Sequence, residues 1–304
     1  MFSYIVAFLG LLVVFYNPIA EFLTPGVPQI RRIPRPRLNE DLLALETAGA
    51  INGTGLQCPP DAYSIHVYSR APLVIYVENF LSADERSHLL EIRFDASPKE
   101  TSRSEPIFEP STVTHDDGPT TERAPTVRDS EVALIPRTDA VRCIEARSRA
   151  LQGWPDEVWT ERLRVQRYRP GGHYNHHFDW NPSRGGWGRV SSFMAWVGDG
   201  GGGLEGGGTE FPRLRLPVDP RWCAFVECPG PDPAADGSAG TQQQQTLGAK
   251  LGVVFKPVAG NAVYWENFRP DGTGRGYDES WHAGLPVVKG VKVGLNIWSW
   301  GKIE

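Results

Sequence analysis

Residues 168–179, YRPGGHYNHHFD, place three histidines within five residues and follow them with an aspartate. His177 and Asp179 are two positions apart, so on a β-strand their side chains point to the same face of the sheet. An imidazole and a carboxylate on one face can supply two neighbouring ligands to a divalent metal. Such a pair arises about once by chance in a chain with 36 acidic residues and 7 histidines, so it needs support from elsewhere in the sequence.

The composition is that of a globular, strand-rich protein. The chain has 304 residues, of which 40% are hydrophobic, and this is enough to build one sizeable core. The 10 tryptophans and 33 glycines favour strands joined by tight turns over a helical bundle. The net charge is −5 and no basic stripe is present, so we expect no nucleic-acid partner.

The N-terminal residues 1–16, MFSYIVAFLGLLVVFY, carry no charge. The length of this run lies between that of a signal-peptide core and that of a membrane span. We interpret residues 1–23 as a hydrophobic anchor or signal and favour the uncleaved anchor. The predicted location is therefore a single-pass membrane protein of the endoplasmic reticulum or secretory pathway, with the orientation left open by the basic cluster at residues 31–37.

The rest of the chain divides by composition. Residues 24–60 are rich in proline, arginine and glycine and are predicted to be a linker. Residues 61–304 are expected to form one domain, in which residues 229–246 are a low-complexity insertion. None of the four cysteines forms a CxxC metal pair, and Cys223 and Cys228 could bridge a loop in an oxidising compartment.

Two helices are predicted before the strand-rich half. Ser82 and Glu85 form a capping box that opens a helix reaching about Phe94, and a second helix fits residues 139–151. Residues 97–127 are polar and proline-rich and are predicted to be a mobile loop. From Trp159 onward, short strand-like runs alternate with turn residues, which predicts a mainly β fold, a sandwich or barrel, with flanking helices.

A third metal ligand is expected from a distant strand, and His282 is a good candidate because it follows a turn-rich stretch and precedes a strand. Two histidines and one carboxylate leave open positions on one side of the metal, as in non-haem Fe(II) oxygenases. Lys292 follows ten residues later, on the same strand face as Gly294. A buried lysine needs an anionic partner, which a dicarboxylate cosubstrate would provide, and Gly294 would leave room for it.

Five motifs then occur in the order found in one known family: PLVIYVENFLS, RVQRYRPGGHYNHHFDW, GGGTEFP, GNAVYWEN and HAGLPVVKGVKVGLNIW. Over residues 72–304 the sequence resembles the 2-oxoglutarate/Fe(II) dioxygenases of the prolyl 4-hydroxylase type. The resemblance implies a double-stranded β-helix (jelly-roll) core with N-terminal helices packed on one sheet. It also implies that Fe(II) is bound by His177, Asp179 and His282.

The resemblance further implies a cosubstrate site. Lys292 would pair with the distal carboxylate of 2-oxoglutarate, Tyr174 would hydrogen-bond the cosubstrate, and Thr209 would join it. Strict strand alternation puts Tyr174 on the opposite face from His177, so the chain must bend between them. The other two histidines of the cluster, His173 and His176, are expected to face solvent or to support the site from outside the ligand set.

The implied reaction uses Fe(II), 2-oxoglutarate and O₂, with L-ascorbate as a further requirement. It hydroxylates an unactivated C–H bond, foremost that of a prolyl residue in a peptide or protein, and releases succinate and CO₂. One alternative is a tailoring oxygenase for a small secondary metabolite, and another is a non-catalytic jelly-roll binding module, against which the complete ligand set argues. An open groove beside residues 97–127 would favour a peptide, and a closed aromatic pocket would favour a metabolite.

Overall fold

The computed structural model describes residues 37–45, 56–94, 108–114, 121–153, 157–181, 186–198, 202–228 and 250–303. Two antiparallel sheets dominate the described part of the chain. The larger sheet has nine strands, in the order β1 (Ser64–Arg70), β2 (Leu73–Glu78), β15 (Ala262–Glu266), β11 (Trp187–Gly198), β18 (Lys292–Lys302), β9 (Arg164–Tyr168), β7 (Glu131–Leu134) and β3 (Glu109–Pro110), with β8 (Val158–Thr160) paired to β18.

The smaller sheet has five strands among the described residues, in the order β14 (Leu251–Phe255), β13 (Thr209–Arg215), β16 (His282–Gly284), β10 (His173–His177) and β6 (Arg128–Asp129). Short strand pairs are formed by β12 (Glu205–Gly206) with β17 (Val287–Lys289) and by β4 (Val113–Thr114) with β5 (Thr121–Glu122). Two 3₁₀ turns, η1 (Pro220–Ala224) and η2 (Asp278–Ser280), lie in the connections. This is the mainly β, jelly-roll arrangement that was predicted.

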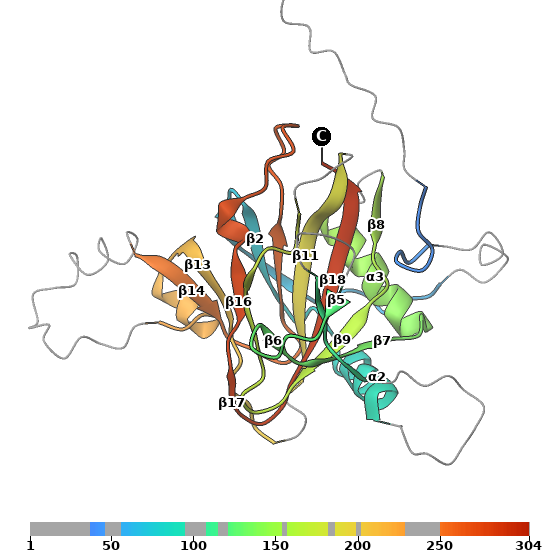
Figure 1. Ribbon diagram of the computed structural model, residues 1–304, viewed down its shortest axis with the longest axis horizontal. Helices are drawn as coiled ribbons and strands as arrows, with labels where there is room; N and C mark the ends of the chain where they lie inside the picture. The colour runs from blue at the N-terminus through green and yellow to red at the C-terminus, as the bar shows by residue number, and fades with distance from the viewer. Residues whose placement is uncertain are drawn as a thin grey trace, which may run out of the picture. The chain divides into compact units, whose positions relative to one another are not determined.

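The two faces of the larger sheet bury different partners. Its inner face packs against the smaller sheet in one hydrophobic cluster, in which Tyr76 and Trp196 meet Phe211 and Phe255. Its outer face is covered by helices α2 (Ala83–Phe94) and α3 (Asp139–Leu151), which contribute Leu89 and other apolar residues to a second cluster. In Figure 1, β13, β14 and β16 lie on one side of β11 and β18, and α2 and α3 lie on the other.

Both helices occur where the sequence predicts them, because their first turns carry their own caps. The Ser82 amide donates to Glu85 and the Glu85 amide donates to the Ser82 hydroxyl, which is the reciprocal capping box. Thr138 caps α3 by accepting from the Val141 amide. Each cap satisfies backbone donors that the first helical turn would otherwise leave unpaired.

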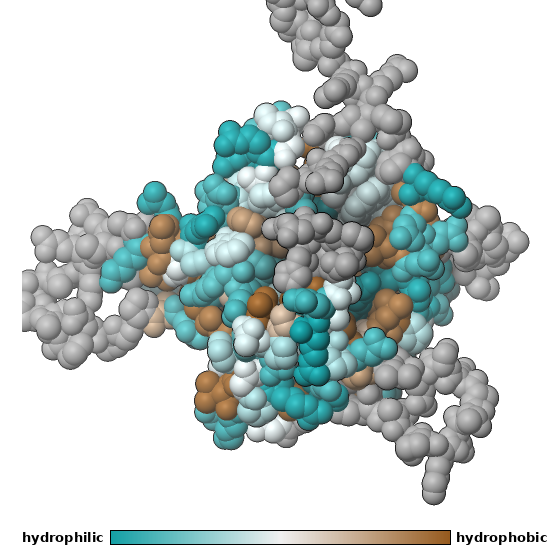
Figure 2. Space-filling model, in the orientation of Figure 1, coloured by the Kyte–Doolittle hydropathy of each residue, from teal (hydrophilic) through white to brown (hydrophobic). Residues whose placement is uncertain are grey.

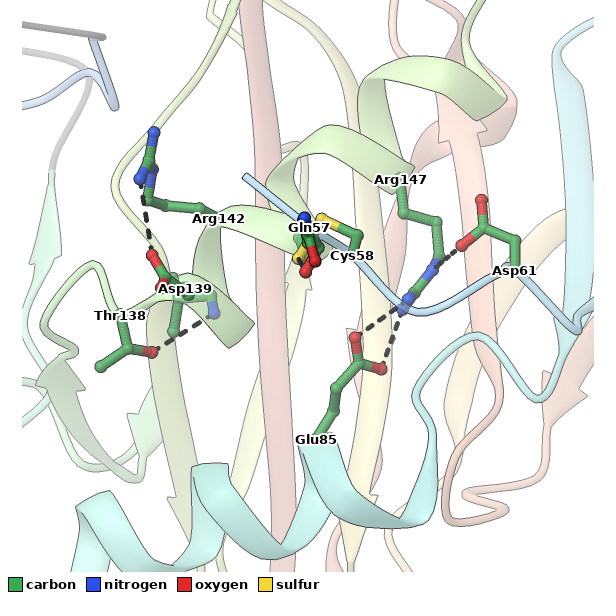
Figure 3. The surroundings of a disulfide bond; sticks show 10 residues. Gln57, Cys58, Asp61, Glu85, Thr138, Asp139, Arg142 and Arg147 are labelled. Atoms are coloured by element: carbon green, nitrogen blue, oxygen red, sulfur yellow. Dashed lines mark hydrogen bonds and ion pairs between the residues drawn. A yellow bond between two sulfur atoms is a disulfide. The ribbon is translucent and has the colours of Figure 1, made fainter. Parts of the chain in front are cut away.

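Parts of the segment predicted as a linker pack on the domain. Leu43 is buried and forms a β-bridge with Glu161, and Cys58 forms a disulfide with Cys143 of α3. In Figure 3 the irregular segment that carries Cys58 and Asp61 passes α3, and Arg147 of α3 joins this segment to Glu85 of α2. This disulfide was not predicted, because its two cysteines are 85 residues apart in the chain. The pairing of Cys223 with Cys228 that the sequence left open is present.

The predicted single-pass membrane location is corrected. No helix within the described residues is both long enough and apolar enough to span a bilayer. The hydrophobic run at residues 1–23 and the predicted insertion at residues 229–246 both lie outside the described residues. On the face drawn in Figure 2, hydrophobic residues form small separate groups among hydrophilic ones.

Candidate metal centre

The three predicted metal ligands lie together at the end of β10. Strands β10 and β16 are antiparallel neighbours, and their register places His177 directly opposite His282. Asp179 follows β10 by two residues and turns back toward both imidazoles. One donor atom from each of the three residues lies within 4.8 Å of the other two. Sheet pairing thus joins residues that are more than a hundred positions apart in sequence.

Hydrogen bonds fix the orientation of each of these side chains. His177 Nδ1 bonds the carbonyl of Asn175 at 2.7 Å, and His282 Nδ1 bonds the carbonyl of Ser280 at 2.9 Å. Each Nδ1 is therefore the protonated nitrogen, and the lone pair of each Nε2 faces the centre of the group. The indole of Trp298 donates to Asp179 Oδ2 at 2.9 Å and holds the carboxylate in place.

The spacing of the donor atoms fits a divalent metal. His177 Nε2 lies 3.6 Å from Asp179 Oδ1, and His282 Nε2 lies 3.9 Å from Asp179 Oδ2. Donors about 2.1 Å from one metal ion and at right angles to one another are about 3 Å apart, so a small inward movement of the side chains would close the site. The two-imidazole, one-carboxylate set is the donor chemistry that Fe(II) takes in oxygenases.

Electrostatics keep these groups in the protonation states that metal binding needs. Burial acts to raise the pKa of Asp179, but interactions with His282, His177 and Arg189 outweigh burial and hold that pKa well below its usual range. Burial lowers the pKa of His282 to about 4, and the neighbouring His177 acts in the same direction. At neutral pH the carboxylate is therefore ionised and the His282 imidazole is neutral.

A small cavity of about 30 Å³ lies beside the metal ligands, and Lys292, Tyr174 and Thr209 all line it. Lys292 is 2% exposed and has no ion-pair or hydrogen-bond partner among the described residues. Burial lowers the pKa of its ammonium group to about 7. An unpaired buried cation beside a metal site is suited to receive an anionic ligand.

The bend required between Tyr174 and His177 is present. The pairing of β10 with β16 shifts register between these two residues, which is an irregularity of the β-bulge type. As a result the Tyr174 ring stacks on the His177 imidazole at 3.6 Å between centroids instead of pointing to the other face. Thr209 is 3% exposed and pairs with Gly284 of β16.

The room expected beside Gly294 is taken by another side chain. A Cβ atom at Gly294 would collide with the terminal methyl group of Met194, which itself lines the cavity. Gly294 therefore accommodates Met194 of the neighbouring strand β11, and the expectation that it leaves space for a cosubstrate is wrong. The alternation of β18 predicts which face Gly294 is on but cannot predict which neighbour fills the gap.

Two cavity-lining residues on β9 were not among the predicted site residues. The Tyr168 ring lies 5.2 Å from Lys292 Nζ, and its hydroxyl donates to Gln166 Oε1 at 2.8 Å. The Nε2 group of Gln166 is buried and has no hydrogen-bond partner among the described residues. The alternation of side chains in RVQRY places Gln166 and Tyr168 on one face of the strand. Strand β9 pairs with β18 so that Tyr168 lies opposite Lys292, and this face is therefore the one that lines the cavity.

Residues 163–300 match the family described as the 2OG-Fe(II) oxygenase superfamily. The chain contains a 2OG-Fe(II) oxygenase domain. This confirms the predicted family, the enzyme class and the requirement for Fe(II), 2-oxoglutarate and O₂. The matched range begins just before β9 and includes all the residues discussed above around the metal ligands.

Solved structures of prolyl hydroxylases are similar to this oxygenase. The viral collagen prolyl hydroxylase of Paramecium Bursaria Chlorella virus-1, in its 2OG complex, is 22% identical, with a TM-score of 0.47 over 75% of this chain and 96% of that one. The Pseudomonas putida prolyl-4-hydroxylase is 16% identical, with a TM-score of 0.44 over 74% and 91% of the two chains. The Trichoplax adhaerens prolyl hydroxylase bound to a hypoxia inducible factor peptide is 13% identical, with a TM-score of 0.44 over 75% and 83%. No curated protein matches this sequence.

A wider cleft of about 580 Å³ adjoins the oxygenase's metal ligands and shares Gln166, Tyr174, His177 and Asp179 with the small cavity. Its lining combines His177 and Asp179 with residues from β5, β6, β7, β9, β11 and β18 and from neighbouring connections. These include Leu42, Thr112, Thr121, Arg128, Glu161, Arg164, Gln166, Tyr174, Trp180, Trp187, Arg189, Trp298 and Trp300. The cleft therefore reaches the segment predicted as the loop at residues 97–127.

One wall of the cleft is held by a buried charge pair. Arg189 donates to both carboxylate oxygens of Glu161, at 2.6 and 3.0 Å, and its guanidinium lies 3.9 Å from the centre of a Trp298 ring. Trp298 in turn bonds Asp179. This chain of contacts links the wall of the cleft to the metal-ligand carboxylate.

The remaining histidines of the cluster lie outside the ligand set. His176 bonds Glu210 at 2.7 Å and its side chain is 40% exposed. His173 bonds the carbonyl of Gly171 at 3.0 Å. Neither belongs to the group of three candidate ligands, so one imidazole of the cluster is used and two are not.

Proposed function

We propose that this protein is an Fe(II)- and 2-oxoglutarate-dependent dioxygenase that hydroxylates a prolyl residue in a peptide or protein and releases succinate and CO₂. One observation carries the proposal. His177, Asp179 and His282 form a three-ligand group that adjoins a small cavity lined by an unpaired buried lysine, and two of the three ligands also line a much larger cleft. We propose residues 61–304 as the catalytic domain, with residues 229–246 as an insertion.

In this proposal the three ligands would hold Fe(II), which would supply the activation of O₂, with 2-oxoglutarate as the co-reductant that is converted to succinate and CO₂. The hydrogen bonds from each Nδ1 keep both imidazoles in the tautomer that offers Nε2 to the metal. Trp298 fixes the rotation of the Asp179 carboxylate. Because the three metal-binding side chains would occupy one side of the ion, the coordination positions on its other side would be available to the cosubstrate and O₂.

The cosubstrate's distal carboxylate would bind Lys292, whose unpaired ammonium group is the strongest attractor for an anion in the cavity. Thr209 and Tyr174 line the same cavity, and the free Nε2 group of Gln166 can donate to a carboxylate oxygen. The surrounding apolar side chains, Met194 and Trp265 among them, exclude water and strengthen these interactions. We expect L-ascorbate to support repeated turnover.

A peptide is favoured over a small metabolite by the shape of the substrate side. The cleft has many times the volume of the cosubstrate cavity, and Thr112 and Thr121 extend it to the segment before β6. Aromatic side chains line part of it, but its volume and length exceed what a small metabolite needs. An extended peptide can lie along such a cleft and present one side chain to the metal.

The proposal is tested with the full-length protein, Fe(II), 2-oxoglutarate, ascorbate and O₂. Succinate is measured with and without proline-containing peptides, and peptide products are examined by mass spectrometry for the gain of one oxygen. We expect slow succinate release alone, faster release with peptide, and neither with His177→Ala. His176→Ala is the matched control because its imidazole is adjacent but bonds Glu210 instead of facing the site.

Each negative result has a distinct meaning. An absence of succinate under all conditions, or unchanged succinate formation by His177→Ala, would contradict the oxygenase reaction assigned to this site. Succinate formation without any peptide product would contradict the prolyl target while leaving the reaction class intact. Comparison of metabolites from knockout and parent cells would then identify species that lack one oxygen.

A further inference from the structure

Arg164 is a cation in the cleft that nothing in the described structure neutralises directly. It lies on β9, lines the cleft together with the metal ligands His177 and Asp179, and is only partly exposed. Its guanidinium makes no hydrogen bond or ion pair with any described residue. The other arginines of the cleft differ in this respect, since Arg189 is paired with Glu161 and Arg128 donates to Ser130.

The position of Arg164 on its strand directs it toward the site. Arg164, Gln166 and Tyr168 alternate along β9 and share one face. Tyr168 and Gln166 line the cosubstrate cavity, and Gln166 and Arg164 line the cleft. Arg164 is thus the next residue outward from the metal on the strand that forms one wall of the reaction site, and its main chain pairs with Asn296 of β18.

The charges around Arg164 favour an anion. Burial lowers the pKa of Arg164; Glu161 acts in the opposite direction, and Arg189, Arg128 and Arg162 lower the pKa further. The Glu161 carboxylate already accepts two hydrogen bonds from Arg189. An arginine remains charged even under these conditions, and its five N–H donors fit a carboxylate in a two-bond arrangement.

We propose that Arg164 binds a carboxylate of the substrate, so that the preferred substrate is an acidic peptide with an aspartate or glutamate close in sequence to the hydroxylated residue. The proposal rests on the proposed function, because it takes the cleft to be the peptide site. Pairing with the substrate would supply the partner that Arg164 lacks in the described structure. A neutral peptide would leave the guanidinium partly desolvated and unpaired, which disfavours its binding.

The test compares three peptides that differ only beside a central proline, with Asp, Asn or Lys as flanking residues. Hydroxylation is measured as kcat/KM, and binding is measured anaerobically by fluorescence polarisation of labelled peptides. The variants are Arg164→Gln and Arg164→Glu. The matched control is Arg162→Gln, which removes a positive charge two residues from Arg164, at a side chain that does not line the cleft.

We expect the wild-type protein to prefer the Asp peptide over the Asn peptide by about tenfold or more in both measurements. Arg164→Gln should lose this preference, Arg164→Glu should prefer the Lys peptide, and Arg162→Gln should behave as wild type. The proposal is overturned if the wild-type protein shows no preference or if Arg164→Gln retains it.

Failure of the proposed function gives a different pattern. If no peptide is hydroxylated, the prolyl assignment fails, and the polarisation data still decide the role of Arg164. A preference for the Asp peptide in binding that Arg164→Gln removes supports carboxylate recognition by this residue, and equal binding of the three peptides contradicts it.

Discussion

Two buried basic side chains, Arg147 and Lys292, have opposite surroundings. Arg147 of α3 is 6% exposed and donates to Glu85, Asp61 and the carbonyl of Phe80. Lys292 of β18 is 2% exposed and has no such partner among the described residues. Bonds to Glu85 and Asp61 outweigh burial and raise the pKa of Arg147, whereas burial lowers that of Lys292 to about 7.

The difference separates structural charge from binding charge. A buried cation that is fully paired within the chain stabilises the fold as long as its partners remain. A buried cation without a partner lowers the stability of the ligand-free protein and is tolerated where a ligand supplies the missing anion. By this criterion we expect the contacts of Arg147 on α3 to stabilise the domain. We expect Lys292 on the inner face of β18 to bind the anionic cosubstrate. The predictions below test this distinction.

The largest effect is expected at the metal ligands. His282→Ala should reduce succinate formation to background, because one of three metal donors is lost. Circular dichroism should show a folded protein, since the Phe211 and Trp265 rings that contact His282 remain packed in the rest of their hydrophobic cluster. Fe(II) binding, measured by calorimetry under anaerobic conditions, should fall in parallel. Normal iron binding by His282→Ala would contradict the assigned ligand set.

Breaking the paired cation should affect stability. Arg147→Ala leaves Glu85 buried without its partner, so the free energy of unfolding should fall by about 3–5 kcal/mol. Urea denaturation measures this change. The KM for 2-oxoglutarate of the folded variant should stay at the wild-type value. A stable Arg147→Ala protein with a raised KM for 2-oxoglutarate would contradict this distinction, because Arg147 would then serve cosubstrate binding and not the stability of the fold.

Removing the unpaired cation should have the opposite effect on the ligand-free protein. Lys292→Met should raise the free energy of unfolding at neutral pH by roughly a few kcal/mol, because no buried ammonium group then has to be desolvated. The same change should raise the Kd for 2-oxoglutarate about 100-fold. A loss of stability in Lys292→Met would show that the lysine has a structural partner after all.

The pH dependence of cosubstrate binding follows from the same group. The pKa of Lys292 in the folded protein is about 7, below its ordinary value of 10.5. Between these two values the unfolded chain holds a proton on this lysine that the folded protein lacks. The free energy of unfolding therefore rises with pH across this window. Binding of an anion requires the charged form, so affinity for 2-oxoglutarate should fall above pH 7, approaching tenfold per pH unit. Calorimetry in buffers of different ionisation enthalpy should detect uptake of one proton, and Lys292→Arg should abolish it.

The smallest effect is expected at Gln166. Gln166→Leu removes the free Nε2 group from the cavity wall. The KM for 2-oxoglutarate should rise about fivefold to tenfold, because this factor corresponds to the free energy of one hydrogen bond. The kcat should change little. Gln152→Leu is a suitable comparison, because that amide bonds Ser191 and Ser299 away from the cavity and its loss should lower stability instead.

Much of the site was predictable from local patterns. The two-residue spacing of His177 and Asp179, and the alternation of Lys292 with its neighbours on β18, follow from the period of a strand. The two helices were also predictable, since their caps are local sequence features. The membrane location was wrong because it rested on a hydrophobic run whose length does not distinguish an anchor from other segments.

Other features depended on contacts between distant segments. The bulge that brings Tyr174 onto His177, the filling of the space at Gly294 by Met194, and the disulfide of Cys58 with Cys143 each involve residues that the tertiary fold brings together. The residue types of the site and the strand faces they occupy could be read from the sequence, because both follow from short-range geometry. Which buried charges have partners could be seen only in the folded protein, because pairing depends on how separate strands and helices pack.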